Sequence, residues 1–198
     1  MSGGGAFVES LGDVQALAAS LVVERPIVLV GLMGAGKTTI GRRLAAALNL
    51  PFVDADEEIE RAAGLPVAEI FARHGEPEFR RGERRVIERL LQGPPHVLAT
   101  GGGAFMDPET RALVRATSTS VWLRAELDVL LRRVEKRDTR PLLRQGDPRQ
   151  VLERLMAERH PQYAEADVIV DSNNLPHGAA VTQVLHALHA LDRQRRAP

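Results

Sequence analysis

The stretch that decides the fold runs from Ile27 to Thr38 and reads IVLVGLMGAGKT. Its first four residues form a short apolar run of the kind found in buried strands, and a helical pattern follows over Lys37–Leu48. The eight residues from Gly31 onward match the G-x-x-x-x-G-K-S/T pattern of a phosphate-binding loop. A strand, this loop and a helix in immediate succession predict a P-loop nucleotide site.

Each part of the loop has a chemical purpose. Glycines allow successive backbone N–H groups to turn toward a phosphate, and the following helix directs its positive dipole end at the same anion. Lys37 places a positive charge at the β- and γ-phosphates, and the Thr38 hydroxyl is an oxygen ligand suited to Mg²⁺. The loop therefore predicts ATP as co-substrate and Mg²⁺ as cofactor.

The rest of the chain alternates between short apolar runs and helical patterns. Strands are expected at Ile27–Val30, Phe52–Asp54, His96–Ala99, Thr119–Leu123 and Val168–Val170. Helices are expected at Lys37–Leu48, Asp56–Ala63, Val67–Arg73, Pro77–Leu91, Glu126–Arg137, Pro148–Tyr163 and His177–Leu191. This alternation predicts an α/β fold in three layers, with a five-stranded parallel sheet covered by helices on both faces. Ligands of such sheets bind at the carboxyl ends of the strands.

Residues 1–26 form a leader ahead of the predicted domain, which comprises residues 27–198. The leader's apolar residues recur at three- and four-residue steps, at Phe7, Leu11, Val14, Ala18 and Leu21. This spacing predicts one amphipathic helix that ends at Pro26. The helix either packs on the surface of the domain or contacts a partner or second subunit. We expect a monomer, because no long exposed apolar stripe remains, with a dimer through the leader helix as the alternative.

The composition narrows the possible functions. Lys+Arg and Asp+Glu both number 26, which is not the charge balance of a nucleic-acid-binding protein. Cysteine is absent, which excludes disulfides, thiolate catalysis and zinc sites built on cysteine. The chain has no apolar window near the roughly 20 residues of a membrane span, and acidic residues interrupt the apolar stretch near its start. We expect a soluble, cytoplasmic protein that binds neither nucleic acid nor membranes.

Two carboxylates follow the second expected strand. Asp54 ends that strand, and Asp56 opens the next helix, where one interpretation of it is a helix N-cap. If the first crossover is short, this strand lies next to the P-loop strand, and both carboxylates reach the sheet edge near Thr38. Mg²⁺ needs a carboxylate there, and an acceptor hydroxyl needs an anionic partner. We assign Asp54 to the metal and Asp56 to the acceptor hydroxyl.

Six segments in order, within about residues 27–191, resemble the shikimate kinase family. They read GLMGAGKT from Gly31, FVDADEEIE from Phe52, IFARHGEPEFRRGE from Ile70, GGGA from Gly101, TRPLL from Thr139 and RHPQY from Arg159. The resemblance implies transfer of the γ-phosphoryl group of ATP to the 3-hydroxyl of shikimate. The products are shikimate 3-phosphate and ADP, in a step of aromatic amino acid biosynthesis.

The resemblance also implies roles for individual residues. The implied ATP contacts are Gly34, Ala35, Gly36, Lys37, Thr38, Thr39, Arg133 and Arg140. The implied shikimate contacts are Asp56, Arg80, Gly101, Gly102, Gly103 and Arg159. The implied metal ligands are Thr38 and Asp54, and the implied catalytic residues are Asp56, Lys37 and Arg140. Arg140 belongs to a mobile lid at about residues 138–148, and Arg133 stacks on adenine beside an adenine loop at Ser172–His177.

Two other functions fit parts of the same pattern. Another small-molecule P-loop kinase, such as a gluconate kinase, shares the loop, but it does not need two carboxylate-binding arginines together with a triple glycine. A sensor of the same fold binds an aromatic ligand without catalysis. Such a sensor does not need the full set Lys37, Thr38, Asp54, Asp56 and Arg140. The pattern as a whole favours the shikimate kinase interpretation.

Overall fold

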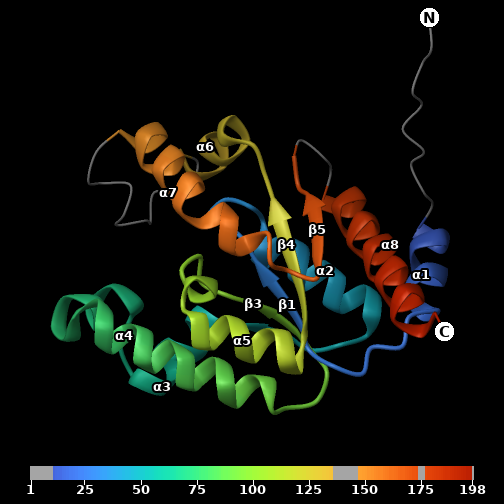
Figure 1. Cartoon of the computed structure of the whole chain (residues 1–198), viewed down its shortest axis with the longest axis horizontal. Helices are drawn as coiled ribbons and strands as arrows, with labels where there is room; N and C mark the ends of the chain where they lie inside the picture. Colours follow the sequence, from blue (N-terminus) through green and yellow to red (C-terminus); the bar gives the residue numbers. More distant parts are fainter. Residues whose placement is uncertain (1–10, 136–146, 174–176, 198) are drawn as a thin grey trace, which may run out of the picture.

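The computed structural model describes residues 11–135, 147–173 and 177–197 (Figure 1). Five parallel strands form one sheet in the order β2-β3-β1-β4-β5. Their bounds are β1 Ile27–Val30, β2 Phe52–Asp54, β3 Val97–Ala99, β4 Thr119–Arg124 and β5 Val168–Asp171. The predicted fold class, a parallel five-stranded sheet between helical layers, is confirmed. Most of the predicted lid lies outside the described residues.

Helices cover both faces of the sheet (Figure 1). Their bounds are α1 Leu11–Ala19, α2 Lys37–Leu48, α3 Ala55–Ala63, α4 Val67–Leu91, α5 Pro108–Thr117, α6 Leu127–Glu135, α7 Pro148–Tyr163 and α8 His177–Arg196, with a 3₁₀ turn, η1, at Ala104–Met106. Helices α2 and α8 pack together on one face, and α5 and α7 lie on the other. On that second face Trp122 of β4 contacts the His160 and Tyr163 rings of α7 at 4.9 and 5.8 Å between centroids. None of the described helices is long and apolar enough to cross a membrane.

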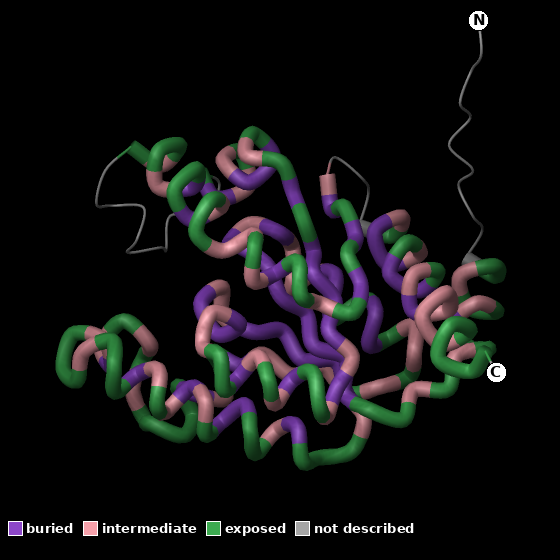
Figure 2. Tube along the Cα trace, in the orientation of Figure 1, coloured by how far each residue is buried: buried purple, intermediate pink, exposed green. Residues whose placement is uncertain are grey.

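The central strands are buried because they read as unbroken apolar runs. Every residue of β1 and β3 is buried, and Figure 2 shows this buried path through the middle of the molecule. A second, smaller apolar cluster joins α3 to α4 through Ile59, Ile70, Phe79 and Val86. The α3–α4 pair, at the β2 edge of the sheet, therefore has an apolar cluster of its own beside the main core.

The strand order corrects one prediction. The strand ending at Asp54 was expected beside the P-loop strand, but β3 lies between β2 and β1. Helix α2 crosses over β3, so the crossover passes one strand position before β2 begins. Asp54 still reaches the P-loop edge, because its register partner Ala99 is also the partner of Leu29 in β1.

Helix ends also differ from the predictions at several points. Asp54, not Asp56, is the N-cap of α3, and its carboxylate accepts a hydrogen bond from the Asp56 backbone N–H at 3.1 Å. The leader helix α1 ends at Ala19 instead of Pro26, and it packs against α2 and α8. Helix α4 is continuous except for a break at Gly75, where φ is 76° and ψ is 169°. The two predicted helices, Val67–Arg73 and Pro77–Leu91, lie on either side of that break.

One helix was not predicted at all. Helix α5 follows the triple glycine and η1, with Asp107 as its N-cap and Pro108 in its first turn. The Asp107 carboxylate accepts hydrogen bonds from the Thr110 backbone N–H at 3.2 Å and the Thr110 hydroxyl at 2.8 Å. An Asp-Pro pair is a recognised helix-start signal, so the sequence contained evidence for this helix.

Candidate active site

The P-loop adopts the conformation that its sequence predicts. Gly36 is the N-cap of α2 with φ 98° and ψ 13°, a left-handed conformation that side-chain-bearing residues rarely adopt. The Lys37 ammonium lies over the loop and donates hydrogen bonds to the carbonyls of Gly31 at 2.7 Å and Leu32 at 3.0 Å. The positive end of the α2 dipole and the Lys37 ammonium are thus both at the P-loop. This concentration of positive charge suits a polyphosphate.

Thr38 and Asp54 form the predicted metal-binding pair. The Thr38 hydroxyl donates a hydrogen bond to Asp54 Oδ2 at 3.1 Å, although the two residues belong to different elements. Among the described residues no cluster of three or more His, Cys, Asp or Glu side chains is placed to hold a metal. A hydroxyl and a carboxylate nevertheless fit Mg²⁺, which keeps several waters and takes further ligands from phosphates.

Neighbouring side chains approach two residues of the triple glycine closely. A Cβ on Gly101 would lie 2.9 Å from Asp56 Oδ1 and 3.0 Å from Glu83 Oε1. A Cβ on Gly103 would lie 2.7 Å from Arg80 Cζ, so a side chain there would displace the Arg80 guanidinium. The loop is therefore the surface against which Asp56, Glu83 and Arg80 come together.

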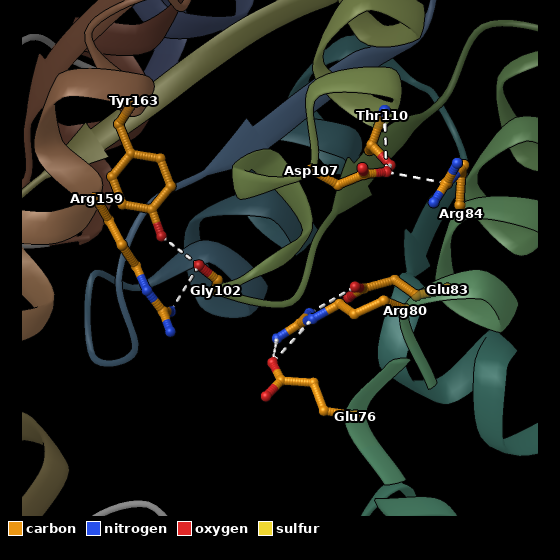
Figure 3. Close-up of polar contacts among 9 residues, drawn as sticks. All are labelled: Glu76, Arg80, Glu83, Arg84, Gly102, Asp107, Thr110, Arg159 and Tyr163. Atoms are coloured by element: carbon orange, nitrogen blue, oxygen red, sulfur yellow. Dashed lines mark hydrogen bonds and ion pairs between the residues drawn. The ribbon is translucent and has the colours of Figure 1, made fainter. Parts of the chain in front are cut away.

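Arg80 is held between two glutamates of α4 (Figure 3). Its Nη1 donates to Glu83 Oε2 at 2.6 Å, while its Nε and Nη2 donate to Glu76 Oε1 at 3.3 and 3.2 Å. The Glu83 side chain is only 3% exposed, whereas that of Glu76 is 64% exposed. Burial raises the pKa of Glu83 above its usual range, against the lowering effect of Arg80.

Arg159 reaches the same loop from the opposite side, from α7. Its Nη1 donates to the Gly102 carbonyl at 2.9 Å, and the Tyr163 hydroxyl donates to the same oxygen. Burial raises the pKa of Tyr163 to about 12, so this phenol remains a hydrogen-bond donor near neutral pH. The ring also lies against Phe105, with 6.4 Å between the ring centroids. Tyr163 thereby ties α7 to the glycine loop.

Arg80, Gly103 and Arg159 line one cavity of about 500 Å³. Figure 3 shows the two arginines reaching toward this space from different elements. The rest of its wall consists of Glu76, Met106, Asp107, Glu158 and Gln162. Asp107 also forms an ion pair with Arg84 of α4, at 3.0 Å to Nε, which fixes α4 against the start of α5. A small molecule bearing a carboxylate is the kind of ligand that two converging guanidinium groups bind.

Arg133 connects the P-loop to the end of β5. Its guanidinium donates to the Gly34 carbonyl at 3.2 Å and to the Ser172 carbonyl at 2.6 Å. The Ser172 hydroxyl in turn donates to the Ala35 carbonyl at 2.9 Å. Burial, together with the like charge of Arg132, lowers the pKa of Arg133. Arg133 therefore lies beside the P-loop and not in the cavity lined by Arg80 and Arg159.

The comparison with known protein families agrees with this geometry. A family model described as shikimate kinase matches residues 33–189, which is most of the chain. The chain belongs to the shikimate kinase family. Its shikimate kinase relative from Paramagnetospirillum magneticum is 60% identical over 166 residues, covering 84% of this chain and 85% of the relative. The family assignment confirms the predicted family and, with it, an ATP-dependent kinase.

Solved structures support the same family. The shikimate kinase from Acinetobacter baumannii, solved in complex with shikimate, superposes with a TM-score of 0.80 at 34% identity. The match covers 91% of this chain and 99% of that one. A gluconokinase from Sinorhizobium meliloti has a TM-score of 0.63 at 20% identity, covering 88% of this chain and 97% of that one. That second likeness shows the fold alone.

The structure of this shikimate kinase family member brings most of the predicted site residues together. Asp56 lies against Gly101, Thr38 contacts Asp54, and Arg80 and Arg159 share one cavity. Arg140, the predicted lid arginine, and residues 174–176 of the predicted adenine loop lie outside the described residues. The roles assigned to individual residues remain predictions.

Sequence reasoning missed three polar residues around this site. Glu83 follows Arg80 at a spacing that places the two on one helix face, a signal that could have identified it. Tyr163 belongs to the RHPQY segment, but the role of its hydroxyl depends on the Gly102 carbonyl that it meets in the fold. The ion pair of Asp107 with Arg84 links segments distant in sequence, so no local pattern indicated it.

Proposed function

We propose that this chain transfers the γ-phosphoryl group of ATP to the 3-hydroxyl of shikimate, giving shikimate 3-phosphate and ADP. The observation that carries the proposal is the single cavity that holds both Arg80 and Arg159 beside the glycine loop. Two guanidinium groups there suit the carboxylate of a small acid, and the glycine loop next to them lies close to the P-loop. Family membership supports the same acceptor.

Asp56 is proposed to act on the acceptor hydroxyl. Its carboxylate lies against Gly101, and the position of a Cβ on Gly102 would be 3.7 Å from both the Gly31 carbonyl oxygen and the Met33 nitrogen of the P-loop. An acceptor on this loop would therefore lie between Asp56 and the phosphates. Asp56 would orient the hydroxyl and accept its proton while the hydroxyl oxygen forms its bond to the γ-phosphorus and the bond to the ADP oxygen breaks.

The remaining residues would position the reactants and balance their charge. Lys37 and the N–H groups at the start of α2 would hold the phosphates, and Thr38 and Asp54 would hold Mg²⁺. When bound, Mg²⁺ neutralises part of the phosphate charge. Arg133 would contact the bound nucleotide. Arg140 would add positive charge at the transferring phosphoryl group when the lid excludes water. Positioning and electrostatics then supply most of the catalysis, as is usual in phosphoryl transfer.

We further propose that the protein works as a monomer in the cytoplasm. Helix α1 packs on α2 and α8 of its own chain, and the Ser20 hydroxyl lies 3.0 Å from His189 Nε2 of α8. These contacts support the interpretation of the leader helix as part of the domain surface, without requiring a second subunit to cover it.

The proposal predicts that shikimate stimulates ADP release from ATP-Mg²⁺ and that Asp56→Asn abolishes most of this release. We expect turnover to fall about 100- to 10,000-fold, because the acceptor hydroxyl loses its anionic partner. ATP affinity should stay near that of the unmodified protein, since Asp56 does not belong to the P-loop. Release is measured with a coupled ADP assay, and nucleotide affinity by calorimetry.

Glu57→Gln is the matched control for this variant. Glu57 is the next residue of α3, 58% exposed, and pairs with Arg42 on the surface. Glu57→Gln removes one negative charge, as Asp56→Asn does, but at a side chain on the surface and not at the glycine loop. Turnover should therefore be preserved. Shikimate-independent ADP release would point to a different acceptor. Measurable shikimate binding without any ADP release would favour the sensor. Near-normal turnover in Asp56→Asn would refute the role of Asp56.

A further inference from the structure

We propose that Glu76 is an internal competitor for Arg80 and thereby sets how strongly the site binds carboxylates. Its carboxylate contacts the Nε–Nη2 edge of the Arg80 guanidinium, an edge that can also bind a carboxylate of the substrate. This inference rests on the proposed function, in which Arg80 and Arg159 bind the acid group. It concerns what must happen at Arg80 before that acid group can bind.

The donors of Arg80 are divided between two glutamates that differ in geometry. Nη1 makes a short contact with Glu83 Oε2, at 2.6 Å. Nε and Nη2 share the single oxygen Glu76 Oε1, at 3.3 and 3.2 Å. Charge-assisted N–H···O bonds in a two-oxygen fork are typically about 2.7–2.9 Å. Glu76 thus uses the Nε–Nη2 edge less well than a bidentate carboxylate would.

Burial makes only one of these two glutamates exchangeable. The Glu83 side chain is enclosed beneath the glycine loop, with Oε1 near Gly101. Glu76 lies mostly in solvent on the wall of the cavity (Figure 3). Removing Glu83 from Arg80 would leave a buried carboxylate without its cation, whereas Glu76 can turn into water. The arriving acid therefore displaces Glu76, and Glu83 keeps Arg80 in place.

The backbone around Glu76 makes this displacement easy. Gly75 breaks α4 immediately before it, so Glu76 begins the second helical segment and Pro77 follows in its first turn. A carboxylate at the start of a helical segment is stabilised by the helix dipole whether or not it contacts an arginine. Glu76 therefore has a favourable environment in both states, bound to Arg80 or turned away from it.

The consequence is a general loss of affinity for acids. A carboxylate that contacts only Arg80 gains little, because it replaces one acid with another. An acid that also contacts Arg159 and the glycine loop gains more binding free energy than is lost when the Arg80–Glu76 contact breaks. Glu76 should therefore weaken binding of every carboxylate by a similar factor, which keeps simple anions out while a fully contacted substrate still binds.

Glu76→Gln tests this inference, with Glu78→Gln as matched control. Glu78 is on the same helix and pairs with Arg81 on the exposed surface, so its loss removes the same charge nearby. We expect Glu76→Gln to tighten shikimate binding about two- to fivefold, as befits a partly exposed ion pair. The inhibition constant of acetate should fall by a similar factor, while kcat and the KM for ATP stay within about twofold. Glu78→Gln should leave the affinity for shikimate unchanged.

Calorimetry without nucleotide measures the shikimate affinity independently of turnover. Unchanged affinity in Glu76→Gln would overturn the inference, and weaker affinity would show that Glu76 orients Arg80 instead of competing for it. Equal tightening in both variants would also overturn it, because a general charge effect would then suffice. If affinity for shikimate tightens only in Glu76→Gln but shikimate does not stimulate ADP release, Glu76 competes for Arg80 as proposed, and the proposed reaction is refuted. If shikimate stimulates ADP release but its affinity does not tighten in Glu76→Gln, the proposed reaction is supported and the role of Glu76 as competitor is refuted.

Discussion

The nucleotide side and the acid-binding side of this molecule are built in different ways. On the nucleotide side, Lys37 contacts the carbonyls of Gly31 and Leu32, residues of its own short segment. On the acid-binding side, Arg80 comes from α4, Gly103 from the loop after β3 and Arg159 from α7. The P-loop is a local conformation, whereas the acid-binding site exists only when three distant segments pack together.

The P-loop and Arg80 also rest on different parts of the core. The P-loop joins β1 and α2, whose buried residues belong to the main cluster. Phe79, the neighbour of Arg80, belongs to the smaller cluster between α3 and α4. Tyr163 and Phe105, beside Arg159, belong to the main cluster. Fewer buried apolar contacts make local opening easier, so the α3–α4 part of the acid-binding side is expected to be less stable than the P-loop. The contrast predicts that variants on one side should leave the other side's ligand largely unaffected.

The largest effect is expected from Lys37→Met, on the nucleotide side. Loss of the ammonium should lower kcat about 100- to 1,000-fold, because positive charge at the transferring group is removed. Shikimate affinity measured without nucleotide should stay within about twofold. Arg43→Met, which removes an exposed cation from the same helix, is the control and should retain activity. An equally large loss of shikimate affinity in Lys37→Met would break the division into two sides.

An intermediate effect is expected from Arg80→Lys, on the acid-binding side. Lysine keeps the charge but cannot hold a carboxylate with two parallel hydrogen bonds. The KM for shikimate should rise about 10- to 100-fold while the KM for ATP changes little, as steady-state kinetics would show. Arg81→Lys, at a side chain 62% exposed that pairs with Glu78, should behave like the unmodified protein. If the KM for ATP rose together with that for shikimate, the two sides would not be independent.

The smallest effect is expected in the pH dependence of stability. The raised pKa of Glu83 means that the folded protein binds more protons at this site than the unfolded chain. Its contribution to stability is therefore full below the ordinary glutamate pKa of about 4.3 and declines as pH rises through the folded-state value. Glu83→Gln should lack this decline, which thermal unfolding between about pH 4 and 7 would detect.

Glu78→Gln again separates burial from charge in this experiment. It removes a carboxylate from the exposed face of α4, so its stability should follow the same pH trend as the unmodified protein. A pH trend in Glu83→Gln that matched the unmodified protein would show that Glu83 does not carry the effect. A positive result would locate a pH-dependent element on the acid-binding side.

Local patterns predicted the elements better than their arrangement. All five strands were found, since β1, β3 and β4 read as apolar runs bounded by loop residues. The order of those strands was partly wrong, because nothing in the sequence of β2 states which neighbour it pairs with. Helix α5 was missed, although Asp107 and Pro108 mark its start.

The sequence by itself determined the P-loop and the alternation of strands and helices. Their hydrogen bonds and backbone conformations involve residues only a few positions apart, as for Gly36, Lys37 and Gly31. Only the tertiary structure decided that Glu83 is buried while Glu76 is exposed on the same helix, and that Tyr163 and Arg159 meet at one carbonyl. Burial and convergence depend on which surfaces pack together, and side-chain identity along the chain does not specify that pairing.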